Sequence, residues 1–528
     1  MSRWTRRLAA AAVLAPAART ARTARACLPA ILAAAVLVSA LPAQAEEFVN
    51  PKAQQPPQAK PQRRSGGESL PPLPLPATPL RRSERKREPA PPALVGMITF
   101  SGQRFIQQDG QRVAVDLFPT TQVDIERLTN FANNKLNVRY RYVSTTLEQF
   151  SWDPVELPLL YITGWTPMPA LGDATLDKLR RYLYDGGTLV VHAQCGRKEF
   201  VDSARRELNR LFPDRQLAPL DTDSPIFRSY FRVGQMRFRK DAEEFRSIPP
   251  YIEAIYIGCR PAVIFSPIDL NCGWDVAANP IQGGILYHQD DAMALGVNIV
   301  TCTLANLKYA RAFATEKIYH QQGDKTRDQL VIGQVVHGGD WDPTPHALPN
   351  LMKYLAGHTT LNVQFKRVPV SLADDKAFDH VVLYMTGLRD FKFSPAEAAR
   401  LKTYLASGGV LVADAGAGCK AFDVAFRREI KRVLGEAELK PIALDSPLFE
   451  APFKVRAVDY TEAAKAAQPD LNAPMLLAAS VDNSLAVIYS PYSLANGWEQ
   501  IPFAYNIGYG DDDALRLGVN ILAYAVTH

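Results

Sequence analysis

The sequence predicts an α/β protein built from two copies of one domain, each with a mainly parallel sheet between two layers of helices. One block occurs twice, as LDKLRRYLYDGGTLVVHA at 176–193 and as ARLKTYLASGGVLVADA at 399–415. Each block has the periodicity of an amphipathic helix, then a Gly-Gly pair suited to a left-handed helix end, then an apolar strand. Because these strands are apolar almost throughout, we expect helices on both faces of each sheet.

Further matches between the two halves occur in the same order along the chain. The matching pairs are YITG (161–164) with YMTG (384–387), DSPIF (223–227) with DSPLF (445–449), FSPIDLNCGWD (265–275) with YSPYSLANGWE (489–499), and DDAMALGVNI (290–299) with DDALRLGVNI (512–521). Ordered matches of this kind indicate a tandem duplication. We therefore predict a first repeat at 93–320 and a second repeat at 328–528.

Strand-like and helix-like segments alternate through the first repeat, as they do in parallel sheets with helical crossovers. The expected strands are 94–100, 137–143, 157–163 and 188–193, and the expected helices start near Thr121, at Leu176 and at Phe200. Four further strand-like segments, at 230–239, 251–258, 262–267 and 283–288, precede a closing helix at 290–313.

The second repeat shows the same succession of segments. The expected strands are 329–337, 361–368, 380–386, 410–415 and 484–491, and the expected helices are 345–357, one that starts in a capping box at Ser394–Glu397, 422–434 and 512–526.

The first 45 residues are predicted to be a signal peptide for export to the periplasm or cell envelope. An arginine-rich start, an apolar run at 28–41 and an A-x-A pattern at Ala43–Ala45 follow the order of a cleavable signal. The apolar run is shorter than the roughly 20 residues that span a bilayer. Two alternatives stay open, an uncleaved anchor and a twin-arginine signal at Arg6-Arg7.

Residues 46–92 are rich in Pro, Arg and Gln, and we predict a disordered linker there. This basic arm either makes weak contact with an anionic surface or is a plain spacer, and we favour the spacer. The chain carries a net charge of +6, but fifteen Lys and Arg against five Asp and Glu lie in residues 1–95. The remainder is mildly acidic, which argues against nucleic acid as a partner.

Cleavage after Ala45 would leave five cysteines. An odd number leaves at least one thiol free or paired between chains. One pair among Cys195, Cys259 and Cys272 is a candidate disulfide, and the sequence leaves the choice open.

Several motifs resemble those of the bacterial family called domain of unknown function 4159. They are GGDW at 338–341, an L-x-x-Y-L-x-x-GG helix before an Asp-bearing strand, the two D-S-P segments, NGWE at 496–499 and the closing LGVNI helices. The second repeat fits better, since the first has SGQRF (101–105) in place of GGDW. That family is similar in fold to class I glutamine amidotransferase-like domains, a flavodoxin-like three-layer sandwich. Its activity is uncharacterised, so the resemblance implies a fold and no substrate.

Amidotransferase-like enzymes carry a nucleophilic cysteine in a sharp turn after a strand, in a G-x-C-x-G frame. We place that turn at His192 and Asp414, where neither repeat has a cysteine. Cys195 comes three residues after His192, opposite Ala417. Glutamine hydrolysis is therefore not expected. A thiol–imidazole pair of Cys195 with His192 is a weaker alternative than a plain loop cysteine.

Ligands of open parallel sheets bind beyond the carboxyl ends of the strands, and this rule selects the candidate residues. The catalytic candidates are Asp340, Asp414 and Glu499, and the binding candidates are Trp341, Thr386, Gly387, Asn496, Trp498, Thr163, Gly164, His192 and Cys195. Convergence of the carboxylates, with Asp342, on Ca²⁺ or Mg²⁺ is a minor alternative. Trp274 and Trp498 are either packing anchors or sugar-stacking platforms, and we favour packing. We predict no cofactor.

The leading hypothesis is an exported, non-catalytic binding or scaffolding protein whose ligand or envelope partner the sequence does not identify. The alternative is a hydrolase of a carbohydrate or envelope component, with Asp340 and Asp414 as an acid/base pair or as metal ligands. A third, weaker interpretation is a pseudo-dimer in which the two sheets pack on each other.

Overall fold

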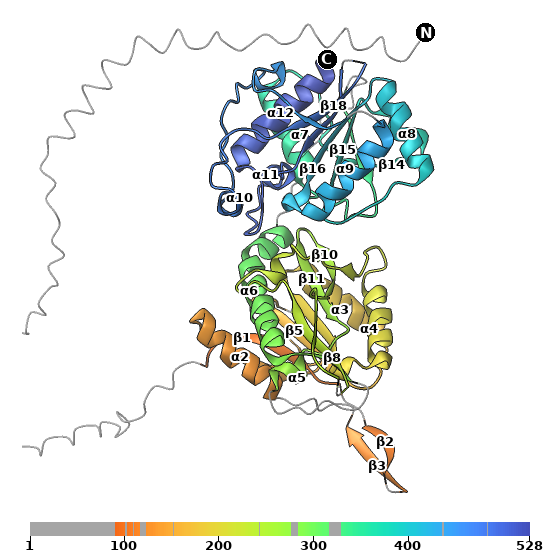
Figure 1. Cartoon of the computed structure of the whole chain (residues 1–528), viewed down its shortest axis with the longest axis vertical. Helices are drawn as coiled ribbons and strands as arrows, with labels where there is room; N and C mark the ends of the chain where they lie inside the picture. The colour runs from red at the N-terminus through yellow and green to blue at the C-terminus, as the bar shows by residue number, and fades with distance from the viewer. Residues whose placement is uncertain are drawn as a thin grey trace, which may run out of the picture. The chain divides into compact units, whose positions relative to one another are not determined.

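The first repeat contains a seven-stranded sheet in the order β4-β1-β5-β6-β11-β10-β7 (Figure 1). Its strands are β1 Ala93–Ile98, β4 Arg141–Thr145, β5 Leu159–Gly164, β6 Thr188–Ala193, β7 Ala218–Pro219, β10 Glu253–Ile257 and β11 Arg260–Ser266. Five strands are parallel, and β10 and β7 form an antiparallel edge. Taken in chain order, the parallel strands lie 2-1-3-4-5, which is the order of doubly wound flavodoxin-like sheets.

The computed structural model describes residues 90–100, 103–108, 110–116, 123–150, 153–241, 243–275, 284–315, 329–435, 438–482 and 484–528. The predicted signal peptide at 1–45, and the predicted linker up to residue 89, lie outside the described residues. Among the described helices, none combines the length and apolar character that a membrane span needs.

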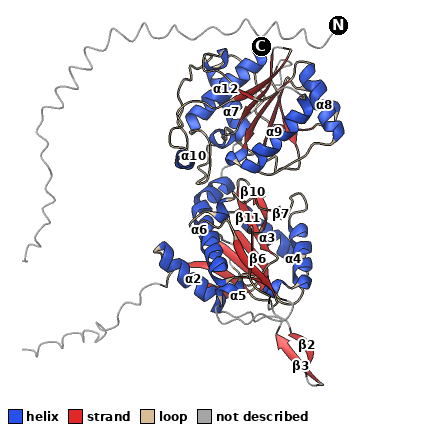
Figure 2. Ribbon diagram, viewed as in Figure 1, coloured by secondary structure: helices blue, strands red, loops and turns tan. Residues whose placement is uncertain are grey.

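Helices cover both faces of the first sheet (Figure 2). They are α2 Val123–Leu136, α5 Asn271–Trp274 and α6 Gln289–Thr315 on one face, and α3 Asp173–Tyr184 and α4 Lys198–Leu211 on the other. Successive strand residues point to opposite faces. Tyr161 and Val190 accordingly pack in the core beside α2 and α6, whereas Leu160 and Val191 pack in the core beside α3 and α4.

Two smaller sheets extend the first repeat. Strands β8 Met236–Lys240, β9 Arg246–Ile248 and β12 Ile285–Tyr287 form a three-stranded sheet, and β2 Gln103–Gln108 pairs with β3 Gln111–Asp116 in a hairpin. The predicted strand at 230–239 is therefore shorter than expected, and the hairpin was not predicted.

The second repeat has the same topology, in the order β14-β13-β15-β16-β19-β18-β17. Its strands are β13 Ile332–Val336, β14 Val368–Ser371, β15 Val382–Gly387, β16 Val410–Ala415, β17 Lys440–Pro441, β18 Leu477–Val481 and β19 Ser484–Ser490. Its helices are α7 Ala347–His358, α8 Pro395–Ala406, α9 Lys420–Leu434, α10 Glu462–Ala467, α11 Ala495–Glu499 and α12 Asp511–Thr527. The capping box at the start of α8 is present, with Pro395 in the first turn. The predicted arrangement of two tandem α/β domains with mostly parallel sheets is confirmed.

Two predicted strands start later than expected. Asn137 adopts a left-handed φ of 52° just after α2, so β4 begins only at Arg141. In the second repeat, β14 begins at Val368, the last residue of the predicted 361–368 strand. It contains Pro369, which an edge strand tolerates because one of its sides has no ladder to join.

The Gly-Gly pair has the same two structural roles in both repeats. The first glycine has a positive φ, 112° at Gly186 and 86° at Gly408, as the helix end requires. At the second glycine, a Cβ atom would lie 2.2 Å from the ring of Tyr182 in one repeat and of Tyr404 in the other. The pair therefore ends the helix and also makes room for an aromatic ring.

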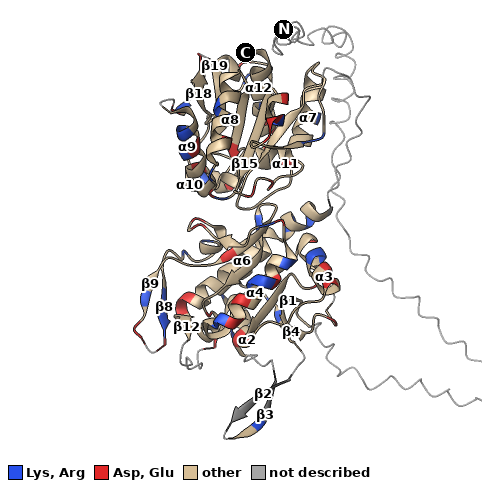
Figure 3. Cartoon of the chain, turned by 90° about the vertical axis from the view of Figure 1, so that its right-hand side faces the viewer, with Lys and Arg blue, Asp and Glu red and all other residues tan. Residues whose placement is uncertain are grey.

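The outer helices carry both signs of charge, as α3 and α4 show (Figure 3). On α4, Lys198 forms an ion pair with Asp202 at 2.5 Å.

Residues Pro91–His528 belong to one compact unit, and a few specific contacts join its repeats. Arg389 donates to the carbonyl oxygen of Ala254 at 2.6 Å, and Lys420 pairs with Asp223 at 2.9 Å. The amide nitrogen of Asn496 lies 3.3 Å from the sulfur of Cys259. These contacts come from loops, strand ends and a helix start, because both faces of each sheet are already covered by helices.

Candidate functional site

Asp414 lies at the carboxyl end of β16 and is completely buried. Its Oδ1 accepts a hydrogen bond from the hydroxyl of Tyr384 at 2.6 Å. Its Oδ2 accepts from the Ser493 hydroxyl at 3.1 Å and from the backbone N–H groups of Leu494 and Ala495 at 2.8 and 3.0 Å. Burial raises the pKa of this carboxyl. Asp414 therefore fastens the loop after β19 to the strand end, and no part of it faces solvent.

His192 occupies the matching place at the end of β6, opposite Thr163 of β5 as Asp414 is opposite Thr386 of β15. Its Nε2 makes a short hydrogen bond with the Tyr161 hydroxyl. Complete burial lowers the pKa of His192 to about 4, so the imidazole is neutral at neutral pH.

The Tyr161 hydroxyl also donates to Asp124 at 3.3 Å, and Asn271 donates to the same carboxylate oxygen at 2.8 Å. Asp124 lies in the first turn of α2, and burial raises its pKa to about 6. Asp124 was not among the sequence candidates. Its acidic position at a helix start was visible, but helix capping explains such a residue equally well.

The sharp turn after each central strand lies at Cys195 and Ala417, not at His192 and Asp414 as predicted. Cys195 and Ala417 both have φ 50°, a left-handed conformation that is uncommon for residues other than glycine. Loop side chains hold both turns: Asp269 accepts from the N–H of Cys195, and Asn496 accepts from that of Ala417 at 2.9 Å. The first repeat therefore has a cysteine at the turn, which corrects the predicted position of the turn and agrees with the alignment of Cys195 with Ala417.

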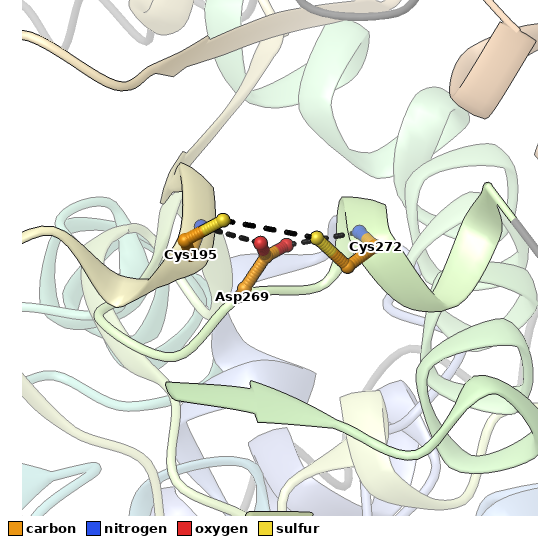
Figure 4. Close-up of side chains that lie close together, drawn as sticks. All are labelled: Cys195, Asp269 and Cys272. Atoms are coloured by element: carbon orange, nitrogen blue, oxygen red, sulfur yellow. Dashed lines mark hydrogen bonds between the residues drawn. The ribbon is translucent and has the colours of Figure 1, made fainter. Parts of the chain in front are cut away.

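Cys195 lies beside a second thiol, that of Cys272, and beside the carboxylate of Asp269 (Figure 4). Its sulfur lies 4.0 Å from that of Cys272, and Asp269 also accepts from the N–H of Cys272 at 3.1 Å. The hydrogen bond to Cys195, burial and the Asp269 charge all raise the pKa of Cys272. Nδ1 of His192 makes no hydrogen bond, so the alternative thiol–imidazole pair is not formed through that nitrogen. The surroundings of Cys272 therefore keep its thiol protonated, contrary to what a nucleophile needs.

The other acidic candidates each have a separate partner. The pairs are Asp340 with Arg389 at 2.6 Å, Asp342 with Arg367 at 2.9 Å, and Glu499 with the N–H and Nδ1 of His346, both at 2.8 Å. Burial raises the pKa of Asp340 and of Glu499.

The predicted carboxylate metal site of the second repeat is not assembled. Among the described residues, the one group of three or more metal-ligating side chains is Cys195, Asp269 and Cys272, in the first repeat. Instead, Asp340 and Asp342 form ion pairs with arginines, and Glu499 accepts from His346.

Most of the binding candidates are packing residues. Trp498 is 1 % exposed and donates from its indole N–H to the carbonyl oxygen of Ala514 in α12 at 2.7 Å. Trp274 makes the matching bond to Ala292 in α6 at 2.8 Å. Thr163, Gly164, Thr386, Gly387 and Asn496 are buried as well. The two tryptophans therefore lie beneath the closing helices and cannot stack on a sugar.

Trp341 differs from these residues because it is half-buried and lines a cavity of about 290 Å³. Asp340 and His337 line the same cavity, together with Arg215 and Tyr256 of the first repeat. It lies beyond β13, next to β15, where the strand order reverses and doubly wound sheets bind their ligands. His337 was not among the candidate site residues and was expected to be a hydrogen-bonded histidine at a strand end. Its Nε2 lies 2.9 Å from the carbonyl oxygen of Thr386, and burial lowers its pKa to about 4.

A family model described as "Domain of unknown function (DUF4159)" matches residues 119–304 and 331–526, one match in each repeat. The search of curated proteins finds no match. The two matched regions cover most of the chain, so the chain belongs to the DUF4159 family.

Proposed function

Starting from its membership in the DUF4159 family, we propose that this chain is an exported, non-catalytic binding protein whose ligand site is the cavity beside Trp341. The observation that carries the proposal is the state of Asp414, which is 0 % exposed and accepts four hydrogen bonds from its own repeat. A carboxylate used in this way has no role left toward a substrate.

The remaining carboxylates support the same conclusion. Glu499 is fully buried against His346, and Asp340 is neutralised by Arg389. A hydrolase needs two carboxyl groups that both reach one substrate bond. The burial of Asp414 removes one of the two groups that the hydrolase alternative requires.

The cavity itself favours a small polar ligand such as a mono- or disaccharide. Trp341 and Tyr256 supply apolar ring surface, while Asp340, Asp342 and Arg215 supply acceptors and donors. Aromatic rings beside a few convergent polar groups are typical of small-molecule sites. The guanidinium of Arg367 lies 5.6 Å from the Trp341 ring centroid, which helps to fix the orientation of the indole.

Export and tethering complete the proposal. They rest on the signal-like residues 1–45 and on the Pro- and Arg-rich composition of residues 46–92. In this arrangement the linker lets the two domains sample ligand in the periplasm or at the envelope.

The test is calorimetric titration of the full mature chain with chitobiose, maltose and cellobiose. Trp341→Ala should weaken binding of the best ligand at least ~10-fold, about 1.4 kcal/mol. Trp165→Ala is the matched control, because Trp165 is also half-buried and lies 4.3 Å from a guanidinium, that of Arg197. Equal binding by both variants would refute the site. Turnover of a saccharide that Asp340→Asn abolishes would refute the absence of catalysis.

A further inference from the structure

We propose that Cys195, Asp269 and Cys272 of the first repeat form a zinc-binding site. The three side chains come from the turn after β6, the loop after β11 and helix α5 (Figure 4). One potential ligand atom from each residue lies within 4.8 Å of the other two. This cluster lies in the first repeat and is distinct from the Trp341 cavity, so it does not depend on the proposed ligand site.

The spacing of the two sulfurs matches a metal-bridged pair better than a covalent bond. Two thiolates at about 2.3 Å from a tetrahedral zinc ion are about 3.8 Å apart. A disulfide holds its sulfurs at about 2.05 Å. The observed separation between Cys195 and Cys272 is 4.0 Å. A zinc ion can thus be bound with little movement of either side chain.

Asp269 holds the arrangement in place. Its two oxygens accept from the N–H groups of Cys195 and Cys272, which fixes the backbone of both cysteines relative to the carboxylate. Each carboxylate oxygen has two acceptor sites, so these bonds leave capacity for a metal. Two thiolates and one carboxylate are also the kind of charged, partly soft ligand set that selects zinc over magnesium or calcium.

His192 lies next to the cluster, but its ring nitrogens are not within 4.8 Å of all three ligand atoms, so its binding in the fourth position requires a movement of its side chain. Its Nδ1 lies 4.0 Å from Oδ1 of Asp269, is buried, and makes no hydrogen bond. Its Nε2 is held by Tyr161, an arrangement that orients metal-bound imidazoles in other sites. Cys195 and Asp269 are buried whereas Cys272 is half-exposed, so the metal can enter on the Cys272 side.

The second repeat shows that the fold does not need these groups. It builds the same turn with Ala417, Ser493 and Asn496 at the corresponding places. Packing alone therefore gives no reason for two thiols and a carboxylate to meet in the first repeat. The second repeat also suggests two test substitutions, Cys195→Ala and Cys272→Asn, because Ala417 and Asn496 occupy these places there.

The experiment measures zinc bound per full-length chain by elemental mass spectrometry after equilibration with zinc chloride under reducing conditions and removal of the excess. The wild-type chain should retain one equivalent, and cobalt(II) in its place should show thiolate-to-metal charge-transfer absorption. Cys195→Ala and Cys272→Asn, which copy the second repeat, should each lose the metal and the absorption. Cys419→Ser is the control, since Cys419 is a half-buried free thiol outside the cluster. His192→Gln should weaken zinc binding by roughly 10- to 100-fold.

Circular dichroism of every variant separates loss of the metal from loss of the fold. The proposal is overturned if the folded, reduced wild-type chain retains no zinc. It is equally overturned if Cys195→Ala and Cys272→Asn keep a full equivalent. Peptide mapping that finds a stable Cys195–Cys272 disulfide in the purified protein, one that persists under the reducing conditions, would also overturn it.

Discussion

In the second repeat the residue at the end of the central strand is a carboxylate, Asp414, that binds the backbone of its own loop. In the first repeat that residue is an imidazole, His192, and the carboxylate comes from the loop as Asp269, which binds the strand-end turn instead. A carboxylate links the loop to the strand end in both repeats. In the second repeat the strand supplies the carboxylate and the loop supplies the N–H donors, whereas in the first repeat the loop supplies the carboxylate and the turn after the strand supplies the N–H donor. The comparison indicates that the fold requires a hydrogen-bonded connection between the loop and the strand end. The side chains that make this connection can differ between the repeats.

The largest effect is expected from Asp414→Ala. The substitution leaves two buried N–H groups and the Tyr384 hydroxyl without their acceptor, and each orphaned donor costs about 1–3 kcal/mol. The Ser493 hydroxyl keeps a second acceptor, Oδ1 of Asn496. We expect the free energy of unfolding to fall by about 3–5 kcal/mol in urea titrations that follow the second repeat. Asp512→Ala, at an exposed position at the start of α12, should change it by less than about 0.5 kcal/mol. A loss below about 1 kcal/mol for Asp414→Ala would contradict the assigned role.

The first repeat should instead show a pH dependence centred on Asp124. Its pKa is raised by burial to about 6, so between about pH 4 and pH 6 the folded chain holds a proton that the unfolded chain has released. The Asp124 contribution to the free energy of unfolding should therefore fall by about 3 kcal/mol as pH rises through this range. The buried His192, whose pKa is lowered to about 4, contributes with the opposite sign, so the Asp124 contribution is the difference between the wild-type and Asp124→Asn pH profiles. Asp124→Asn should remove this contribution. Parallel pH profiles of the two proteins would show that Asp124 does not titrate in this way.

Gly187→Ala and Gly409→Ala test a position where the two repeats have the same structure, a glycine packed against a tyrosine ring. The new methyl group would collide with the ring of Tyr182 or Tyr404, and both substitutions should destabilise their repeat by about 1–3 kcal/mol. Gly172→Ala is the control, because nothing lies within 4 Å of its Cβ position. Thermal unfolding of the three variants provides the measurement. Unequal losses at Gly187 and Gly409 would show that the two corners are not equivalent.

The smallest effect is expected at the left-handed turns. Ala417→Gly relieves a strained φ and should stabilise the second repeat by roughly 0.5–1 kcal/mol. Cys195→Gly should have a similar effect on the apoprotein, while also removing the proposed zinc ligand. Chemical denaturation in the presence of a chelator distinguishes the two contributions. Destabilisation by Ala417→Gly would mean that packing of the Ala417 methyl group stabilises the repeat by more than the positive φ costs.

The fold was largely readable from the sequence because its signals are local. Apolar periodicity and the Gly-Gly pair placed the central helix and strand of each repeat, and their recurrence revealed the duplication. The two-residue edge strands β7 and β17 were missed because pairing, and not composition, creates them. Strand β18, which lies between β19 and β17, was missed as well.

The candidate site was harder to predict because its contacts join distant residues. Asp124 meets Asn271 across 147 positions, and Cys195 meets Cys272 across 77. The turn was misplaced because no sequence rule requires a cysteine or an alanine to adopt a positive φ. Trp341 lies after the end of β13, but its half-exposure could be known only from the structure.

The tyrosine above each Gly-Gly pair also has a consequence for how the chain folds. The hydroxyl of Tyr182 reaches the carbonyl of Leu157 at 2.7 Å, and that of Tyr404 reaches the carbonyl of Val381 at 2.8 Å. Each ring thus links a helix, a turn and the entrance of the neighbouring strand within a stretch of about thirty residues. Contacts this close in sequence form with a small loss of chain entropy. We expect these two corners to be the nuclei from which the sheets grow, each independently of the other.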